Sequence, residues 1–183
     1  MINIIKNFKT SELTNTRFIH PVKVSFNLNG KDKAWEAVSS HDSVAILLYH
    51  EERNAFLLVK QFRAPVYLND NSKTYTYELC AGLVDKDKSL IEIAKEEIDE
   101  ECGYKVSVES IQKVTSFFTN VGISGGCQHL FFAKINESMK IHEGGGVNDE
   151  QIELYFLPIE KSDELIFDES KAKTPGLMFS FYW

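Results

Sequence analysis

The sequence predicts an α/β (α+β) domain, in which a mixed sheet is layered with helices and is preceded by a β-hairpin. Two near-continuous apolar runs, residues 43–49 and 56–62, are typical of buried strands. A helical pattern over residues 89–102 lies between these runs and later strand patterns, as in layered domains. The 183 residues suffice for one such domain with a small appendage. We therefore expect an N-terminal β subdomain over residues 1–40 and the main domain over residues 41–183.

The hairpin is predicted from an alternation of apolar and polar side chains over residues 22–28. Asn29 and Gly30 follow directly, and this dipeptide is typical of a tight hairpin turn. The return strand is expected at residues 34–38. A polar loop is expected at residues 69–74. Further strands are expected at these positions: 75–79, 111–118, 130–135 and 152–157.

The central helix has clear start and stop signals. Ser89 is a good N-cap, and Gly103 stands where helices favour a glycine to end. Gly144-Gly145-Gly146 predicts a flexible loop. After Pro158 we expect a further helix, and the apolar residues 177–183 must be covered by another part of the protein.

Composition excludes several classes of protein. The formal net charge of −7 argues against a nucleic-acid-binding protein, because no excess of Lys and Arg is available for phosphate backbones. The three cysteines are widely spaced and form no C-x-x-C pair, so we expect reduced thiols rather than disulfides or a zinc site. No apolar segment is long enough for a signal peptide or a membrane span. We expect a cytoplasmic protein without membrane contact.

Two glutamates of the central helix lie on its apolar side when the helix is drawn as a wheel. Glu97 and Glu101 fall within the apolar stripe, and Glu100 lies at its edge. Two like-charged carboxylates turned toward a core are costly unless a cation or hydrogen-bond donors meet them. A bound divalent cation such as Mg²⁺, which takes hard oxygen ligands, resolves this conflict. The remaining acidic side chains of the helix match an ordinary solvated face.

The same helix carries a known motif. The sequence from Gly82 to Tyr104 resembles the Nudix box, G-x5-E-x7-R-E-U-x-E-E-x-G-U, where U is a bulky apolar residue. Two positions depart from it, since Lys88 stands in place of the first Glu and Glu96 in place of the Arg. In the family this Arg helps to orient the metal-binding carboxylates. The resemblance implies a Nudix α/β/α sandwich.

The resemblance extends to the nucleotide-sugar pyrophosphatase branch, which includes UDP-glucose and ADP-ribose pyrophosphatases. ADP-ribose enzymes typically carry a Pro and a Ser-Glu pair in a loop where this chain has Val121 and Gly126. We therefore favour UDP-glucose or a similar nucleotide sugar, with ADP-ribose as the close second. The segments that carry the likeness are residues 41–44, 58–63, 78–85, 120–125 and 144–146.

The resemblance implies a set of metal ligands. These are Glu97, Glu100 and Glu101 with the backbone carbonyl of Ala81, holding Mg²⁺ or, as a substitute, Mn²⁺. The ions would bridge a diphosphate and activate a water. Glu100 and Glu101 thus also count as catalytic. The implied reaction splits a nucleoside diphosphate sugar into a nucleoside monophosphate and a sugar phosphate.

A general base is expected in the loop after the glycines, where relatives place an acidic residue. We choose Glu150, with Asp149 and Glu153 as alternatives, although a mobile acidic loop is also typical of a plain surface turn. Arg63 is expected to bind the diphosphate, or else to be a surface arginine at a strand end. Glu78 is expected beside the substrate or metal, or else in a salt bridge at the sheet edge. Gly82, the first residue of the motif, is placed with them at the substrate.

Relatives are homodimers whose N-terminal strands help to build the partner's pocket, so the resemblance implies a homodimer formed through the hairpin. The small-molecule partner is a nucleoside diphosphate sugar. A competing hypothesis is a catalytically weak or inactive Nudix-fold module that only binds nucleotide sugars. Lys88 and Glu96 motivate this alternative, because both depart from the box.

Overall fold

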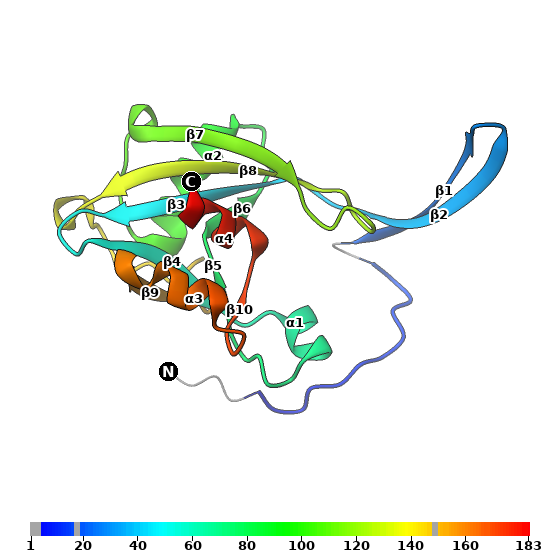
Figure 1. The fold of residues 1–183 in the computed structure, drawn as a ribbon, viewed down its shortest axis with the longest axis horizontal. Helices are drawn as coiled ribbons and strands as arrows, with labels where there is room; N and C mark the ends of the chain where they lie inside the picture. The colour runs from blue at the N-terminus through cyan, green and yellow to red at the C-terminus, as the bar shows by residue number, and fades with distance from the viewer. Residues whose placement is uncertain (1–4, 17–18, 148–149) are drawn as a thin grey trace.

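The computed structural model describes residues 5–16, 19–147 and 150–183. An antiparallel hairpin, formed by β1 (His20–Leu28) and β2 (Lys31–Ser39), projects from a layered body that contains the rest of the strands (Figure 1). Asn29 and Gly30 have φ angles of 54° and 80°, the left-handed conformation that a two-residue hairpin turn requires. The predicted hairpin is therefore confirmed, with both strands longer than expected.

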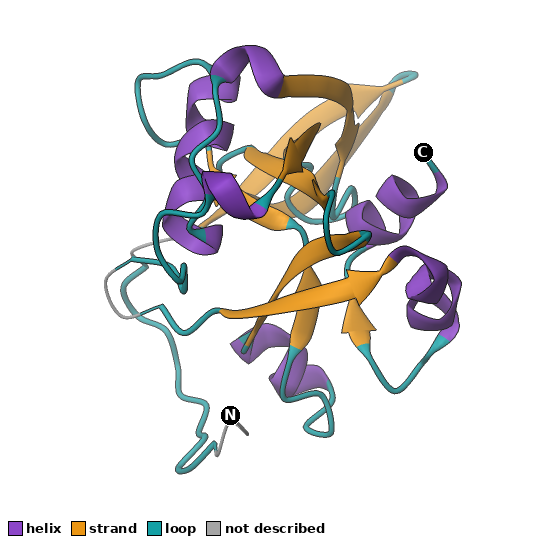
Figure 2. Ribbon diagram, turned by 90° about the vertical axis from the view of Figure 1, so that its left-hand side faces the viewer, coloured by secondary structure: helices purple, strands orange, loops and turns teal. Residues whose placement is uncertain are grey.

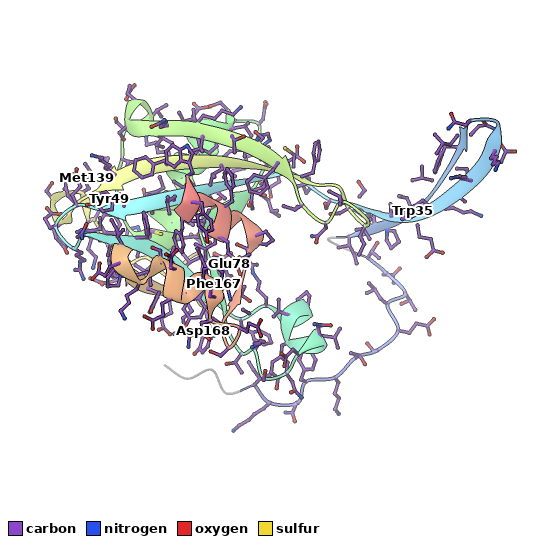
Figure 3. All side chains as sticks on the ribbon, in the orientation of Figure 1. Trp35, Tyr49, Glu78, Met139, Phe167 and Asp168 are labelled. Carbon is purple, nitrogen blue, oxygen red and sulfur yellow. The ribbon has the colours of Figure 1, made fainter. Side chains whose placement is uncertain are left out.

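The hairpin contacts the body through the loop that follows β7. The Trp35 Nε1–H donates to the Gly122 carbonyl at 3.0 Å, and the Val38 N–H donates to the Ile123 carbonyl at 3.0 Å. Trp35 nevertheless stays 57% exposed on the projecting arm (Figure 3). The arm thus presents aromatic surface to its surroundings.

The body is built on a mixed eight-stranded sheet with the order β10-β5-β4-β3-β8-β7, to which β6 adds on β3 and β9 adds on β4. The pairs β3–β8 and β5–β10 are parallel, and the other pairs are antiparallel. The strands are β3 (Ser43–His50), β4 (Ala55–Gln61), β5 (Thr76–Glu78), β6 (Cys80–Leu83), β7 (Ile111–Phe118), β8 (Cys127–Ile135), β9 (Glu153–Pro158) and β10 (Ala172–Lys173).

Strands β3 and β4 separate along their length. They pair only through residues 48–50 and 55–57. The first half of β3 pairs instead with β6, while the end of β4 pairs with β5. This divergence opens the sheet beside β6, and it determines where a cavity can form.

Side chains of β3 alternate between two apolar cores, which makes the body a three-layered sandwich (Figure 2). Val44, Ile46 and Leu48 pack toward helix α2 (Leu90–Cys102). Ala45 and Leu47 face the opposite side, with helices α3 (Ser162–Phe167) and α4 (Pro175–Tyr182). The predicted α/β/α sandwich with a mixed sheet is confirmed.

Helix α2 begins and ends as the sequence predicts. Ser89 and Glu92 form a reciprocal capping box, in which the Glu92 carboxylate accepts the Ser89 N–H at 2.9 Å. Gly103 closes the helix in the left-handed conformation, with φ 77°. These end signals are local, so the helix bounds follow directly from the sequence.

Two helices differ from expectation or complete it. The short helix α1 (Ala64–Asn69) lies just before the expected polar loop, and the sequence pattern does not predict it. The apolar end of the chain is helix α4, in which Leu177 is fully buried and Phe181 stacks on Phe56 with ring centroids 5.0 Å apart. The sheet therefore covers part of the apolar tail, whereas Phe179, Tyr182 and Trp183 remain at least 46% exposed. Short 3-10 turns occur at Val108–Ser110, Glu137–Met139 and Ile159–Lys161.

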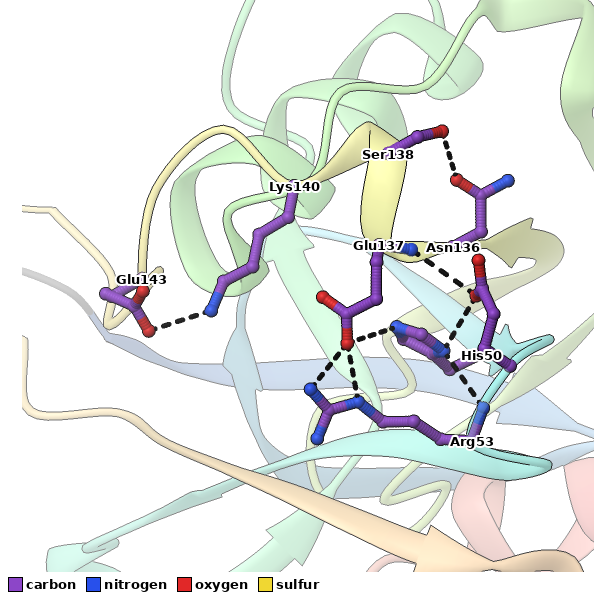
Figure 4. Close-up of polar contacts among 8 residues, drawn as sticks. His50, Arg53, Asn136, Glu137, Ser138, Lys140 and Glu143 are labelled. Carbon is purple, nitrogen blue, oxygen red and sulfur yellow. Dashed lines mark hydrogen bonds and ion pairs between the residues drawn. The ribbon is translucent and has the colours of Figure 1, made fainter.

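A separate polar cluster closes the end of β3. His50 is fully buried, and its ring nitrogens lie 3.4 Å from Glu52 and 3.5 Å from Glu137 (Figure 4). Arg53 also binds Glu137, with a Nε–Oε1 distance of 2.9 Å. These contacts join the β3–β4 turn to the segment after β8.

Of the helices in the described part of the chain, none has the length and apolar character needed to span a bilayer.

Candidate active site

A cavity of about 460 Å³ lies where β3 and β4 diverge, and the acidic side of α2 forms one of its walls. It is lined by the residues that the sequence predicts as metal ligands, as the preferred general base and as substrate contacts. The lining residues are Ser43, Gln61, Arg63, Glu78, Ala81, Gly82, Leu83, Asp85, Lys86, Glu97, Glu100, Glu101, Gln128, Val147 and Glu150. Side chains that are far apart in the sequence therefore meet in one place.

Glu101 is the most deeply placed of the three carboxylates. Its residue is only 5% exposed, and one carboxylate oxygen accepts the Ala81 N–H at 2.9 Å. Burial raises the pKa of Glu101 from its ordinary value of 4.5 to about 8, because desolvation and the neighbouring charge of Glu97 outweigh the hydrogen bond from Ala81. A charged Glu101 thus calls for a nearby cation.

Glu97 lies one helical turn earlier and faces the same cavity. A Cβ at Gly82 would lie 2.1 Å from the Glu97 carboxylate carbon, so a larger residue there would displace this carboxylate. Burial, and then the charge of Glu100, raise the pKa of Glu97 to about 7. Gly82 therefore leaves space for the Glu97 carboxylate, and it also lines the cavity as expected.

Glu100 completes the acidic wall, and its side chain is 35% exposed. The Lys86 ammonium lies 3.9 Å from one of its oxygens. The wheel places Glu100 at the edge of the apolar stripe, and this intermediate exposure agrees with that placement.

The three consecutive glycines pack against the end of α2, where the sequence suggests a flexible loop. The Gly145 N–H donates to the Glu101 carbonyl at 2.8 Å, and the Gly146 N–H donates to the Glu100 carbonyl at 3.1 Å. These bonds satisfy helix-terminal carbonyls that would otherwise lack partners. A Cβ at Gly144 would lie 2.4 Å from the Glu101 carbonyl oxygen, so the close approach depends on glycine. The predicted loop is confirmed, and two of its backbone N–H groups bind the end of α2.

The anchored loop delivers Glu150 to the cavity. One Glu150 oxygen accepts the Val147 N–H at 2.9 Å, and the same residue lines the cavity with the helix carboxylates. The alternative Asp149 lies outside the described residues. The other alternative, Glu153, is in β9, and its carboxylate pairs with Lys60 at 2.7 Å, which holds its pKa below the usual range. Of the described candidates, Glu150 has the better position for a base.

Arg63 and Glu78 form a two-point ion pair inside the cavity. Arg63 donates from Nε to Glu78 Oε1 and from Nη2 to Glu78 Oε2, both at 2.8 Å. The Glu78 side chain is 10% exposed and the Arg63 side chain 46% exposed. The salt bridge weighed for Glu78 therefore exists, but its partner is the arginine expected at the substrate.

The donor set fits a divalent cation in chemistry rather than in a preformed arrangement. Three carboxylates converge on one wall, and Glu97 and Glu101 carry raised pKa values that a cation would relieve. Across residues 5–16, 19–147 and 150–183, no three Asp, Glu, His or Cys side chains are already arranged to hold an ion. Ion binding would thus require these side chains to turn toward the ion. The Ala81 carbonyl belongs to a residue of the same wall.

Several lining residues were not identified from the sequence. Ser43 and Gln128 are register partners on the parallel strands β3 and β8, and the Gln128 amide donates to the Ser43 hydroxyl at 3.3 Å. Gln61 ends β4, and Lys86 belongs to the connection between β6 and α2. Ser43 and Gln61 lie in segments that resemble the family, and Lys86 occupies a variable position of the box, so the sequence alone does not single them out. The tertiary structure brings them into one cavity with Gln128.

The chain is similar to a known domain family and to several known enzymes. A NUDIX domain profile matches residues 39–174. The uridine diphosphate glucose pyrophosphatase of Bos taurus is 32% identical over an alignment of 194 positions, which covers 91% of this chain and 87% of that protein. The corresponding protein of Mus musculus is 27% identical with the same coverage. A GDP-mannose pyrophosphatase of Cronobacter sakazakii is 36% identical over 131 residues, covering 72% of this chain and 67% of that protein.

Proposed function

The chain belongs to the Nudix family and is a hydrolase of pyrophosphate bonds, and on this premise we propose that it is a Mg²⁺-dependent nucleotide-sugar diphosphatase. The proposed substrate is UDP-glucose or a similar nucleoside diphosphate sugar, with ADP-ribose as the second candidate. The observation that carries the proposal is the pair of core-side carboxylates, the half-buried Glu97 and the buried Glu101, on the wall of a cavity that also holds Arg63. We further propose a cytoplasmic location, in keeping with the three free cysteines.

Each wall of the cavity has a distinct task in this proposal. Glu97, Glu100, Glu101 and the Ala81 carbonyl would hold Mg²⁺ or Mn²⁺. The bound ions would neutralise the diphosphate and acidify a nearby water. Glycine at position 82 keeps the Glu97 carboxylate free to turn toward an ion.

The remaining residues bind the substrate and move the proton. Arg63 presents a planar fork to the diphosphate, and Glu78 holds that fork in place by two hydrogen bonds. Glu150 accepts the proton of the attacking water through the carboxylate oxygen that the Val147 N–H leaves free. A new bond forms between the water oxygen and one phosphorus, and the bridging P–O bond breaks. The products are a nucleoside monophosphate and a sugar phosphate.

The proposed substrate can be tested with a panel of nucleotide sugars. Hydrolysis of UDP-glucose, GDP-mannose and ADP-ribose in Mg²⁺, with identification of the products, should show UDP-glucose as the preferred substrate. A Glu101→Gln variant should lose on the order of 10²-fold in kcat/KM, as when other electrostatic groups are removed. If this variant keeps wild-type activity, Glu101 does not act as a metal ligand.

A second candidate function is a binding module with little turnover, which Lys88 and Glu96 motivate. Tight binding of UDP-glucose in calorimetry, with no product at any Mg²⁺ or Mn²⁺ concentration, would establish this alternative. Efficient turnover of any member of the panel would exclude it. The same experiment thus separates the two hypotheses.

We also propose that the chain forms a homodimer through its hairpin. Val22, Val24, Phe26 and Leu28 alternate along β1 and lie on one face, and each is at least 39% exposed. A two-stranded hairpin is marginal in water unless another surface covers its apolar face. A second copy of the chain supplies such a surface.

Light scattering after gel filtration tests this arrangement. Val24→Lys, on the apolar face, should shift the protein from dimer to monomer. Ser25→Lys, on the opposite face of the same strand, is the matched control and should stay dimeric. A wild-type protein that is monomeric at tens of micromolar would contradict the proposal.

A further inference from the structure

Lys86 and Arg63 are the basic side chains among the residues that line the cavity. Lys86 lies between β6 and α2, whereas Arg63 lies between β4 and α1. The Lys86 ammonium is 3.3 Å from a Glu96 oxygen and 3.9 Å from a Glu100 oxygen. A positive charge thus sits beside the proposed metal ligands.

The two departures from the Nudix box are partners in space. The Lys88 ammonium binds the Glu96 carboxylate directly. The box has Glu at the first of these positions and Arg at the second, so the chain carries the same opposite charges in exchanged places. The departures therefore compensate each other and keep the connection between β6 and α2 tied to the helix.

The exchange has a consequence for Lys86. With a carboxylate at position 96, the helix offers a negative partner to a second lysine, whereas an arginine there would repel it. The Lys86 ammonium donates to the Glu96 carboxylate at 3.3 Å, and this contact holds Lys86 at the cavity wall.

We propose that Lys86 binds a phosphate oxygen of the substrate and that Glu96 is its positioning residue, an inference that rests on the proposed diphosphatase function. An ammonium group on a flexible stem is a compact point charge with three donors, which suits a phosphate oxygen. The Arg63 fork is already engaged by Glu78 at two points, whereas Lys86 is held at longer distances and can turn. The diphosphate thus receives one cation from the segment after β4 and another from the connection between β6 and α2.

Lys88 supplies a matched control, because it also pairs with Glu96 but does not line the cavity. We compare Lys86→Met, Lys86→Arg and Lys88→Met by calorimetry with inorganic pyrophosphate in Mg²⁺ and by kinetics with UDP-glucose. Lys86→Met should raise both the Kd for pyrophosphate and the KM on the order of tenfold, with a smaller change in kcat. Lys86→Arg should recover most of this loss. Lys88→Met should change Kd and KM by less than about twofold, while it lowers the melting temperature.

Glu96→Gln tests the positioning role. It should raise KM less than Lys86→Met does, and the double variant should be no worse than Lys86→Met alone, since Glu96 acts through Lys86. The inference is overturned if Lys86→Met leaves Kd and KM unchanged, if it only tightens Mg²⁺ binding, or if Lys88→Met has an equal effect on KM. A wild-type protein that neither binds pyrophosphate nor hydrolyses the panel would instead overturn the diphosphatase proposal.

Discussion

Replacing Glu101 by glutamine should make the metal-free protein more stable at alkaline pH while it removes activity. Glutamine has nearly the same shape, and its carbonyl oxygen can still accept the Ala81 N–H that Glu101 accepts at 2.9 Å. The substitution removes only the charge that the cavity disfavours. Stability and function would therefore change in opposite directions at one residue.

The size of the effect follows from the pKa of Glu101, which burial raises from 4.5 to about 8. Because the folded protein favours the neutral carboxyl, this contribution to stability is fully present below pH 4.5 and is lost as the pH rises through 8. Above that pH the loss amounts to at most about 4–5 kcal/mol. It is an upper limit, since Glu97 titrates in the same interval and shares the cost.

Thermal unfolding in EDTA at pH 5 and pH 9 measures this difference. At pH 9 the Glu101→Gln variant should melt up to roughly 10 °C above the wild type, and at pH 5 the two should nearly coincide. Mg²⁺ should raise the melting temperature of the wild type more than that of the variant. Glu160→Gln removes an exposed charge and is the matched control. If Glu101→Gln gives no gain at pH 9, or the same gain at both pH values, the cavity does not destabilise the charged carboxylate.

Three other substitutions test single contacts of the site. Gly82→Ala should displace the Glu97 carboxylate, because the new Cβ would lie 2.1 Å from its carbon. The Mg²⁺ affinity measured by calorimetry should then fall on the order of tenfold, while the circular dichroism spectrum stays unchanged. Gly144→Ala combines a φ of 68° with a Cβ 2.4 Å from the Glu101 carbonyl oxygen, so urea unfolding should show a loss of about 1–3 kcal/mol. Ser89→Ala removes the capping box of α2 and should cost about 1 kcal/mol in the same assay, with KM for UDP-glucose unchanged. An unaltered unfolding curve for either of the last two variants would contradict the corresponding contact.

Local patterns were sufficient for the elements that carry the carboxylates. The period of α2, with its caps Ser89 and Gly103, places Glu97 and Glu101 on the core side before any tertiary contact is known. The Asn29-Gly30 turn likewise determines the hairpin, because few other dipeptides adopt both positive φ angles readily. In both cases the governing interactions span only a few residues.

Helix α1 and the docking of the glycine loop could not be read in the same way. Helix α1 has six residues, too few for a periodic pattern to appear. The glycine loop donates hydrogen bonds to carbonyls of α2 that lie more than forty residues earlier, at Glu100 and Glu101. Three glycines by themselves predict only conformational freedom.

The chain's amino-acid sequence alone determined the layered fold, the orientation of the helix and the acidic character of the site, because periodicity and capping are local properties. Only the tertiary structure decided which residues share the cavity, since this depends on the divergence of β3 from β4. It also decided the meaning of Lys88 and Glu96. In the sequence they are two separate departures from a motif, whereas in the folded protein they are one ion pair, since helix α2 turns the second side chain back toward the first.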